Sequence, residues 1–273
     1  MKLISSLKHP TLAEARQALN HSGKKKASAF LIDGQPLATQ ALESPLKIEH
    51  LFFLNPAPPD AREAIIELEQ AAREHRIQRA HLTKGMFFKL LGLGYETSAW
   101  VLALVRRPPD DQPLAVDGKQ GCLLVGERIR DPRNVGVLVR NADAFGLSAA
   151  LFCGESADPY CRAALRSTTG SILRTTVGIA DDLPGRLREL KEQGVHLIGS
   201  SAHAQTSCSE ADWSGPCAIL LGNESDGLSP EAAALCDTMV TIPMGGGASS
   251  LNVTVAAGIL LHERTKQVAE VLK

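Results

Sequence analysis

The chain lacks the segments and clusters that mark membrane, secreted and zinc-binding proteins. No apolar run approaches the roughly 20 residues that span a bilayer, and the start, MKLISSLKHPTL, is too interrupted for a signal peptide. The six cysteines show no CxxC spacing and no Cys/His cluster. We therefore expect reduced thiols, mostly in the core, and neither a disulfide scaffold nor a metal site. Together these absences predict a cytoplasmic protein that binds no membrane.

Three common catalytic signatures are also missing. The sequence has no GxxxxGK[ST] phosphate loop, no HExxH and no GxSxG nucleophile elbow. A GxG fragment at residues 92–94 lacks a third glycine and follows a predicted helix instead of preceding one, so we interpret it as a turn. These observations weigh against a dinucleotide oxidoreductase and against a methyltransferase of the Rossmann type.

What remains is an ordinary globular composition with an uneven charge. Hydrophobic residues make up 44% of the 273 residues and charged residues 22%, which suffices for a buried core. Residues 1–107 carry 15 Lys and Arg against 10 Asp and Glu, whereas residues 108–273 carry 14 against 20. The basic N-terminal part is therefore the better candidate for contact with a polyanion.

A change of composition predicts two domains. Residues 106–113 contain three prolines and four charges without an apolar anchor, which is typical of a semi-stiff linker. We place one domain at residues 1–105, the linker at 106–118 and a second domain at 119–273.

Both predicted domains alternate helices and strands. Before the linker we expect helices at 10–20, 60–76 and 83–91, and strands at 30–32, 51–54, 77–82 and 101–105. After it we expect apolar strands at 122–125, 149–152, 195–198, 218–221 and 239–242, and helices at 134–145, 160–170, 183–193, 230–236 and 252–271. Continuous apolar strands between helices predict a mostly parallel sheet with helices on both faces. Ligands of such sheets bind beyond the carboxyl ends of the strands.

The first informative strand end is the segment 131–140. It follows the predicted strand at 122–125 and places Asn134 where a helix begins, as a cap or a ligand contact. Arg140 falls on the polar side of that helix, near Asp143. Taken alone, this pattern is most simply a capped helix with a surface Arg–Asp pair.

Two further strand ends are rich in glycine. The segment 220–228 has two glycines five residues apart around Glu224, which allow either a sharp turn or a close approach to a ligand. The segment 242–253 contains three consecutive glycines, whose conformational cost requires an unusual backbone path or a close approach. We expect the main chain at the ends of the strands near 125, 221 and 242 to form one cradle.

Together these segments carry a family resemblance. DPRNVGVLVRNADAFG, LLGNESDGL and IPMGGGASSLNVTVAAGILLHE resemble the three motifs of the SpoU/TrmH class of SPOUT methyltransferases, and SADPYCRAALRSTTGSILRTTV between them is also similar to that family. FLIDGQPLATQALES and LVRRP resemble the small RNA-binding domain that many members carry at the N-terminus. The chain departs from the pattern at Thr254, where Ser is usual, at His262, where Tyr is common, and over residues 91–100.

The resemblance implies a fold and an activity. The fold is α/β: a C-terminal parallel-sheet SPOUT domain with a deep trefoil knot, preceded by a small α/β RNA-binding domain. The activity is transfer of a methyl group from S-adenosylmethionine to a ribose 2′-hydroxyl of RNA, with ribosomal RNA favoured over transfer RNA. The implied partners are RNA and a second copy of the chain, bound as a homodimer through the C-terminal domain. An RNA-binding or ribosome-assembly factor with a vestigial methyl-donor pocket is the alternative.

The resemblance also assigns residues to the site. The catalytic and substrate-positioning set is Asn134, Arg140, Glu224, Ser250 and Asn252, and the cofactor-binding set is Gly222, Ile242, Met244 and Leu251. Because a guanidinium stays protonated at neutral pH, we favour Arg140 as a group that binds phosphate and stabilises oxyanion charge over a general base. We expect Glu224 to order Asn134 rather than to act on the substrate.

RNA contacts are expected from the basic N-terminal domain. Lys24, Lys25, Lys26 and Arg16 are the predicted phosphate contacts, with Lys8, Arg106 and Arg107 extending the track. A solvated lysine run is the simpler interpretation of residues 24–26.

Overall fold

The chain forms two compact units. The computed structural model describes residues 3–19, 27–91, 98–112, 114, 116, 118 and 120–271. One unit comprises Met1–Pro108 with Tyr160–Arg162, and the other comprises Pro109–Pro159 with Ala163–Lys273. Across the part of the chain that the structure describes, no helix has the length and apolar character needed to cross a membrane.

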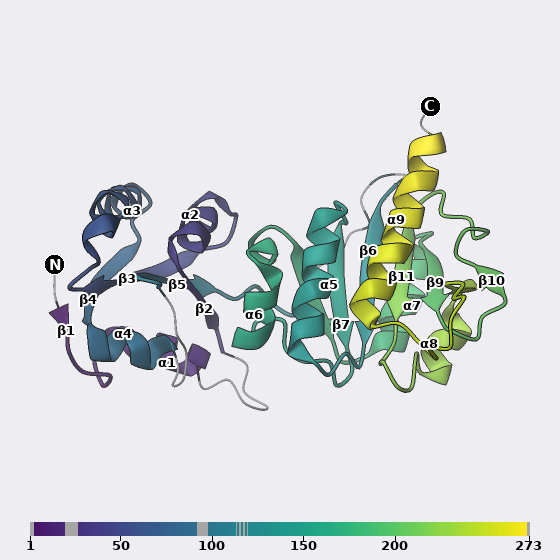
Figure 1. Cartoon of the computed structure of the whole chain (residues 1–273), viewed down its shortest axis with the longest axis horizontal. Coiled ribbons are helices and arrows are strands. Elements are labelled where there is room, and N and C mark those ends of the chain that lie inside the picture. The colour runs from purple at the N-terminus through teal and green to yellow at the C-terminus, as the bar shows by residue number, and fades with distance from the viewer. Residues whose placement is uncertain are drawn as a thin grey trace. The chain divides into compact units, whose positions relative to one another are not determined.

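The N-terminal unit is built on a mixed five-stranded sheet (Figure 1). Its strands are β1 (Leu3–Ile4), β2 (Ala29–Asp33), β3 (Ile48–Asn55), β4 (Gln78–Thr83) and β5 (Val101–Arg106), in the spatial order β1-β4-β3-β5-β2. Its helices are α1 (Ala13–Leu19), α2 (Gln35–Glu43), α3 (Arg62–Glu74) and α4 (Lys84–Leu91), with short 3₁₀ turns η1 (Pro10–Leu12) and η2 (Pro59–Ala61). Strand β5 runs antiparallel to β2 and β3, whereas β4 is parallel to β1 and β3.

The C-terminal unit contains a seven-stranded sheet in which all pairs are parallel. Its strands are β6 (Cys122–Glu127), β7 (Ala149–Cys153), β8 (Thr176–Ala180), β9 (His196–Ser200), β10 (Thr206–Ser207), β11 (Cys217–Leu221) and β12 (Thr238–Thr241), in the order β10-β12-β9-β11-β6-β7-β8. The helices are α5 (Pro132–Ala144), α6 (Arg162–Thr168), α7 (Leu183–Glu192), α8 (Pro230–Leu235) and α9 (Val253–Val271), with a 3₁₀ turn η3 (Ser171–Leu173).

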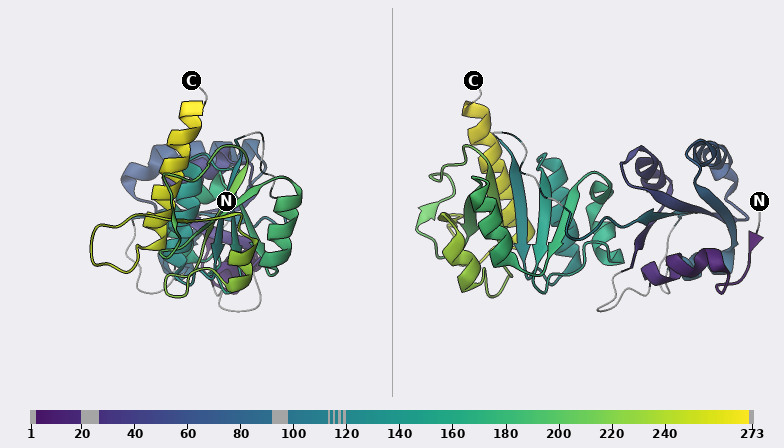
Figure 2. Two further views of the ribbon diagram at one scale, coloured as in Figure 1. Left: turned by 90° about the vertical axis from the view of Figure 1, so that its right-hand side faces the viewer. Right: turned by 180° about the vertical axis from the view of Figure 1, so that it is seen from behind.

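Helices cover both faces of this sheet (Figure 2). Because side chains alternate along a strand, Leu123 and Val125 of β6 point into the core shared with α7 and α8. The residue between them, Leu124, is equally buried and faces the opposite side, where α5 packs against β6 and α9 packs against both α5 and β11. A strand buried on both faces has no polar side, which explains its continuous apolar sequence.

The predicted α/β fold with a parallel sheet is confirmed, but several elements differ from the prediction. Strand β8 was not predicted because Thr176 and the partly exposed end of TVGIA interrupt its apolar run. Helix α5 begins at Pro132, two residues before the predicted start at Asn134, since Asp131 caps it by accepting a hydrogen bond from Arg133 N (2.8 Å). Neither β1 nor α2 was predicted.

Candidate functional site

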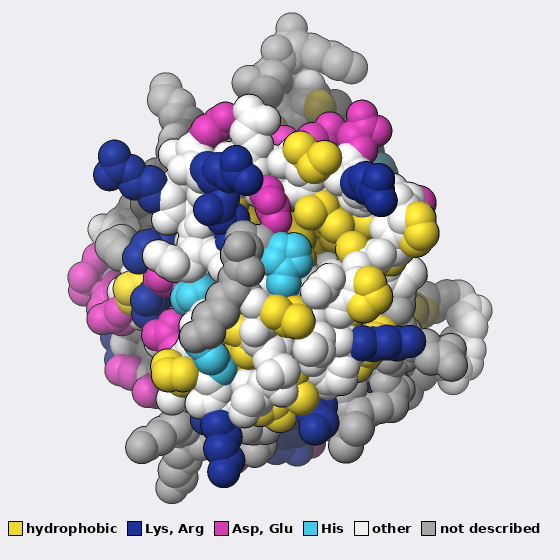
Figure 3. All heavy atoms as spheres, turned by 90° about the vertical axis from the view of Figure 1, so that its left-hand side faces the viewer, with side chains coloured by type: hydrophobic (Ala, Val, Ile, Leu, Met, Phe, Trp, Pro, Cys, Tyr) yellow, Lys and Arg dark blue, Asp and Glu magenta, His cyan; other side chains and the backbone are white. Residues whose placement is uncertain are grey.

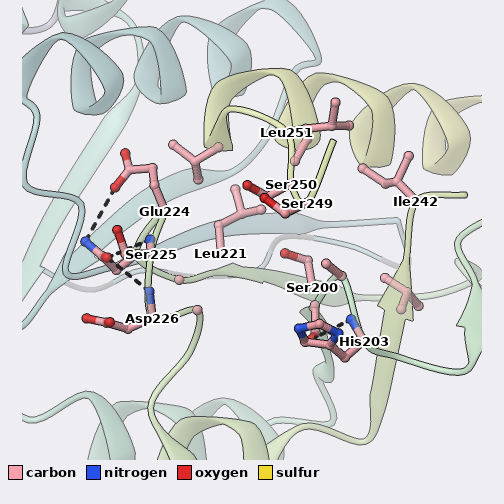
Figure 4. A pocket seen from close by; sticks show the side chains of 18 of the residues that line it. Ser200, His203, Leu221, Glu224, Ser225, Asp226, Ile242, Ser249, Ser250 and Leu251 are labelled. Carbon is pink, nitrogen blue, oxygen red and sulfur yellow. Dashed lines mark hydrogen bonds between the residues drawn. The ribbon is translucent and has the colours of Figure 1, made fainter. Parts of the chain in front are cut away.

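A pocket of about 560 Å³ opens at the carboxyl ends of three neighbouring strands (Figure 4). Its lining comes from four segments. They are the end of β9 and the residues after it (Ser200, Ser201, Ala202 and His203), the end of β11 with the turn that follows (residues 221–227), the end of β12 with the loop after it (Val240, Ile242 and Met244), and the entry to α9 with its first turn (Ser249, Ser250, Leu251, Val253 and Ala256). The pocket thus occupies the position at which parallel α/β sheets bind ligands.

The lining combines an apolar wall with charged and hydroxyl groups. Leu221 and Leu251 are among its apolar side chains, and Figure 4 shows Glu224 and Asp226 near one end of the pocket and Ile242 near the other. Both carboxylates are exposed. An apolar cleft with two carboxylates suits a ligand that has a flat apolar part and a positive charge.

The turn that follows β11, residues 222–228, is closed on itself and is called here the β11 turn. Asn223 and Gly227 exchange two backbone hydrogen bonds, of 3.1 and 2.9 Å. A Cβ atom on Gly222 would lie 2.0 Å from the carbonyl carbon of Gly227, so only glycine fits there. Gly227 itself has φ +67°. The sharp turn, one of the two roles considered for these glycines, is confirmed.

The end of β6 holds the β11 turn in place. The Arg128 guanidinium donates a hydrogen bond to the Gly227 carbonyl (3.1 Å), and the Arg128 carbonyl accepts one from Asn223 Nδ2 (3.0 Å). The buried Glu127 carboxylate accepts a hydrogen bond from Ser229 N (2.7 Å). Contrary to our expectation, the strand end near residue 125 does not line the pocket; it supports the turn that does.

Three of the predicted catalytic residues form a hydrogen-bonded chain across three segments. Asn134 Nδ2 at the start of α5 donates to Glu224 Oε1 at 2.6 Å, and Asn252 Nδ2 donates to Asn134 Oδ1 at 3.4 Å. Asn252 Oδ1 in turn accepts hydrogen bonds from the backbone N (2.9 Å) and the hydroxyl (2.6 Å) of Thr254. Thr254 therefore supplies a hydroxyl to this chain, as the usual Ser would.

Arg140 lies on the same helix as Asn134 but outside this chain of hydrogen bonds. Its side chain is exposed, and within the described residues it has no hydrogen bond or ion pair. The predicted pair with Asp143 is wrong, because Asp143 binds Arg174 (2.6 Å) and Ser171 Oγ (2.8 Å) instead. Burial raises the pKa of Asp143, but these two partners outweigh it and hold the pKa below its usual range.

The remaining predicted residues gather at the pocket. All four cofactor candidates, Gly222, Ile242, Met244 and Leu251, line it, and so does Ser250. The three glycines 245–247 have no positive φ and nothing within 4 Å of where a Cβ would lie. None of the three therefore needs glycine for a left-handed backbone, and the main chain of this loop is left bare.

Several lining residues were not predicted. Ser200, Ser201 and His203 follow a strand that the sequence analysis did identify, so the rule that ligands bind at carboxyl ends would have included them. Asp226 stands within a segment already singled out. For Arg128 the sequence carries no signal, because its role depends on a turn 99 residues away.

The predicted RNA contacts of the N-terminal unit are only partly confirmed as surface residues. Residues 24–26 lie outside the described residues. Arg16 is half-buried and donates to the Leu7 carbonyl at 2.9 Å. Arg107 is buried, 9% exposed, with its guanidinium 4.7 Å from the centre of the Tyr160 ring, so its assignment to a surface track is wrong.

The other two predicted contacts are more accessible. Lys8 is exposed, whereas Arg106 binds Glu49 Oε1 at 2.7 Å. Figure 3 views the end of this unit and shows Lys and Arg side chains spread over the face, with histidine, acidic and hydrophobic side chains between them. Among the residues with described positions, no three His, Cys, Asp or Glu are grouped to hold a metal ion.

Known proteins resemble this chain in sequence and in structure. Over 254 residues it is 28% identical to a 23S rRNA (uridine(2479)-2′-O)-methyltransferase of Streptomyces viridochromogenes, covering 91% of this chain and 86% of that protein. The structure of the SpoU methyltransferase AviRb from the same organism, in complex with AdoMet, superposes with a TM-score of 0.80 at 27% identity, over 94% of this chain and 98% of that one.

A second group of relatives is matched over part of its length. An uncharacterized tRNA/rRNA methyltransferase of Mycobacterium avium is 37% identical over 160 residues, which is 58% of this chain and 52% of that protein. The chain thus spans about half the length of this relative. The SpoU rRNA Methylase family matches residues 121–262, more than half of the chain and all of the pocket. The chain therefore belongs to the SpoU rRNA Methylase family.

Proposed function

We propose that the protein transfers a methyl group from S-adenosylmethionine to a ribose 2′-hydroxyl of RNA, and that the RNA is ribosomal. The observation that carries this proposal is one pocket that has every predicted cofactor residue in its wall and the Asn134–Glu224–Asn252 chain at its edge. The names of the Streptomyces relative and of AviRb, which was solved with AdoMet, support the same activity.

The pocket fits S-adenosylmethionine in size and in chemistry. Its volume of about 560 Å³ is in the usual range for small-molecule sites. Leu221, Ile242 and Leu251 provide apolar surface for the adenine, and the main chain of the β11 turn and of residues 242–251 offers hydrogen-bonding groups. The Glu224 and Asp226 carboxylates give the pocket a negative charge that favours a cationic ligand.

The chain's own residues would position and activate the ribose. S-adenosylmethionine supplies a methyl group on a sulfonium, and the in-line geometry of such a displacement makes orientation the main contribution of the protein. Arg140, exposed and without a described partner, binds the neighbouring phosphate and stabilises charge that develops on the ribose oxygen. Glu224 fixes the Asn134 amide, and Asn134 in turn orients Asn252.

We also propose the homodimer and the trefoil knot that the family resemblance implies. Met244, Val255 and Ile259, on the glycine-rich loop and on α9, have exposures of 38%, 50% and 36%, which is high for large apolar residues. A second copy of the chain packed on this surface would cover them beside the pocket. Sedimentation of the purified protein as a monomer at micromolar concentration would contradict the dimer.

The N-terminal domain at residues 1–105, joined by the linker at 106–118, is proposed to bind RNA. Its excess of Lys and Arg over Asp and Glu supports this role. Lys8, one of its predicted phosphate contacts, is exposed.

Two measurements, made one after the other, test the proposed function. Calorimetry with S-adenosylmethionine should show binding to one site per chain. A transfer assay with tritiated S-adenosylmethionine and bulk RNA should then label the RNA at the 2′ position of one or a few nucleotides. Binding without transfer, or no binding at all, would reject the proposed activity and leave the vestigial-pocket alternative.

A further inference from the structure

Arginine is concentrated in one segment of an otherwise acidic part of the chain. Residues 128–174 contain seven Arg, no Lys and four Asp and Glu, whereas the rest of 108–273 contains seven Lys and Arg against 16 Asp and Glu. The segment from the end of β6 to η3 thus carries a net positive charge, whereas the rest of 108–273 is net negative. Arginine alone supplies this positive charge, and arginine is the side chain whose planar fork matches phosphate.

Two of these arginines lie next to Asn134 at the start of α5. Arg130 and Arg133 flank Asp131, which caps α5, and Asn134, the next residue, is bonded to Glu224 in the pocket wall. The Arg130 and Arg133 side chains are 61% and 76% exposed. They therefore lie on the surface beside the site and outside its hydrogen-bonded interior.

A third arginine continues the same surface along α5. Arg133 and Arg140 are seven residues apart, so they project from the same face of the helix, about 10.5 Å apart along its axis at a rise of about 1.5 Å per residue. Both are exposed. Arg130, just before α5, and Arg133 and Arg140 on α5 are called here the arginine face.

The ion pairs of Arg130 and Arg133 are weak enough for a phosphate to bind these side chains. Arg130 pairs at 3.1 Å with Glu155, whose side chain is itself 77% exposed, and Arg133 pairs at 2.8 Å with Asp131. Pairs between exposed side chains are weak and screened by salt. A phosphate can replace Glu155 on Arg130 or add to the free edge of the Arg133 guanidinium.

We infer that the arginine face binds the phosphates of the RNA strand next to the methylated nucleotide. This inference rests on the proposed function and deepens it, because it places an RNA-binding surface in the catalytic unit itself.

The test removes two arginines that have no part in the chemistry. Binding of an in vitro transcript of 23S ribosomal RNA is measured over a range of salt concentrations for the wild type and for the double variant Arg130→Ala/Arg133→Ala. Each lost phosphate contact lowers the salt slope by about 0.7 to 0.9, so the double variant should lose about 1.5 units of slope. Its KM for RNA should rise about tenfold or more, with the affinity for S-adenosylmethionine unchanged.

Matched controls separate a local contact from a general charge effect. Arg186→Ala/Arg188→Ala removes the same charge from α7, on the other face of the sheet, and should keep the wild-type slope. The double variant Arg130→Lys/Arg133→Lys retains the charge and should restore most of the salt slope. A wild-type slope in the Arg130/Arg133 alanine variant, or an equal loss in the α7 variant, would overturn the inference.

The outcome for the proposed function is read separately. If the wild-type protein transfers methyl groups but the alanine variant keeps its slope, the arginine face is wrong and the proposed function stands. If the slope changes as expected but no variant, including the wild type, transfers methyl groups, the surface binds RNA and the proposed function is wrong.

Discussion

At the scale of single residues, the site depends on polar side chains that are hydrogen-bonded to one another. Asn134, Glu224 and Asn252 come from α5, the β11 turn and the start of α9, and two hydrogen bonds join them. Their amide and carboxylate groups are thereby fixed in orientation. Within the described part of the chain Arg140 has no such partner, since Arg174 takes the Asp143 carboxylate that would otherwise pair with it.

The first prediction concerns Arg140. Arg140→Ala should reduce methyl transfer by about a hundredfold or more, the usual cost of losing a group that stabilises oxyanion charge. Affinity for S-adenosylmethionine should stay within about twofold, because Arg140 does not line the pocket. Single-turnover transfer and calorimetry measure the two quantities. Unchanged turnover would remove Arg140 from the mechanism.

Arg128 is predicted to act through the β11 turn. Loss of its hydrogen bond to the Gly227 carbonyl, worth about 1.5–3 kcal/mol for a charged donor, should weaken S-adenosylmethionine binding about tenfold in both Arg128→Ala and Arg128→Gly. Because residue 128 has φ +56°, the glycine variant should be the more stable of the two by about 1 kcal/mol. Wild-type affinity in both variants would show that the turn holds its shape alone.

A third prediction uses a buried thiol far from the pocket. Cys217 Sγ lies 3.7 Å from Cys122 Sγ and accepts a hydrogen bond from the buried Arg264 Nε at 3.2 Å. The Cys122 thiol and the Arg264 guanidinium lower the pKa of Cys217 to about 7.

A depressed thiol pKa stabilises the fold at high pH. The contribution is complete above the pKa of the unfolded chain, about 8.5, and is lost as the pH falls to the folded value of about 7. The excess unfolding free energy of the wild type over Cys217→Ala should therefore be larger at pH 9 than at pH 7. Burial raises the pKa of Cys236 to about 11, so the same comparison with Cys236→Ala should show no such rise. Urea denaturation measures both free-energy differences. Equal pH profiles for the two variants would contradict the lowered pKa of Cys217.

At the scale of elements, the fit of the β11 turn against itself decides the shape of the pocket. Gly222→Ala would bring a Cβ to within 2.0 Å of the Gly227 backbone, so the turn has to move. We expect about 2 kcal/mol or more of lost unfolding free energy and at least a tenfold weaker S-adenosylmethionine complex. Gly246→Ala has open space around its Cβ and should cost less than about 0.5 kcal/mol. Equal losses in the two variants would contradict this account of the turn.

The elements that sequence patterns predict well are those with a strong local signal. Strands β7 and β11 are apolar throughout and β6 is apolar over its first four residues, and the parallel sheet follows from such strands. Strand β9 has a shorter apolar centre. Strand β8, with a glycine in its middle, and the two-residue β10 have no such signal. The start of α5 was misplaced because the capping role of Asp131 was overlooked.

At the scale of the whole molecule, the site depends on which strands are neighbours, and local patterns do not contain that information. The order β12-β9-β11-β6 places the ends of β9, β11 and β12 around one pocket, although they are far apart in the chain. The family motifs identified the residues at the ends of β11 and β12. They did not reveal the contribution of β9, or that the end of β6 supports the β11 turn from outside the pocket.

The most direct test of the central claim is a map of ribose methylation across total RNA from cells with and without the gene. We predict that deletion removes 2′-O-methylation from one or a few nucleotides of ribosomal RNA, that the wild-type gene restores it, and that a gene carrying Arg140→Ala does not. A map in which deletion changes no nucleotide would contradict the proposed activity.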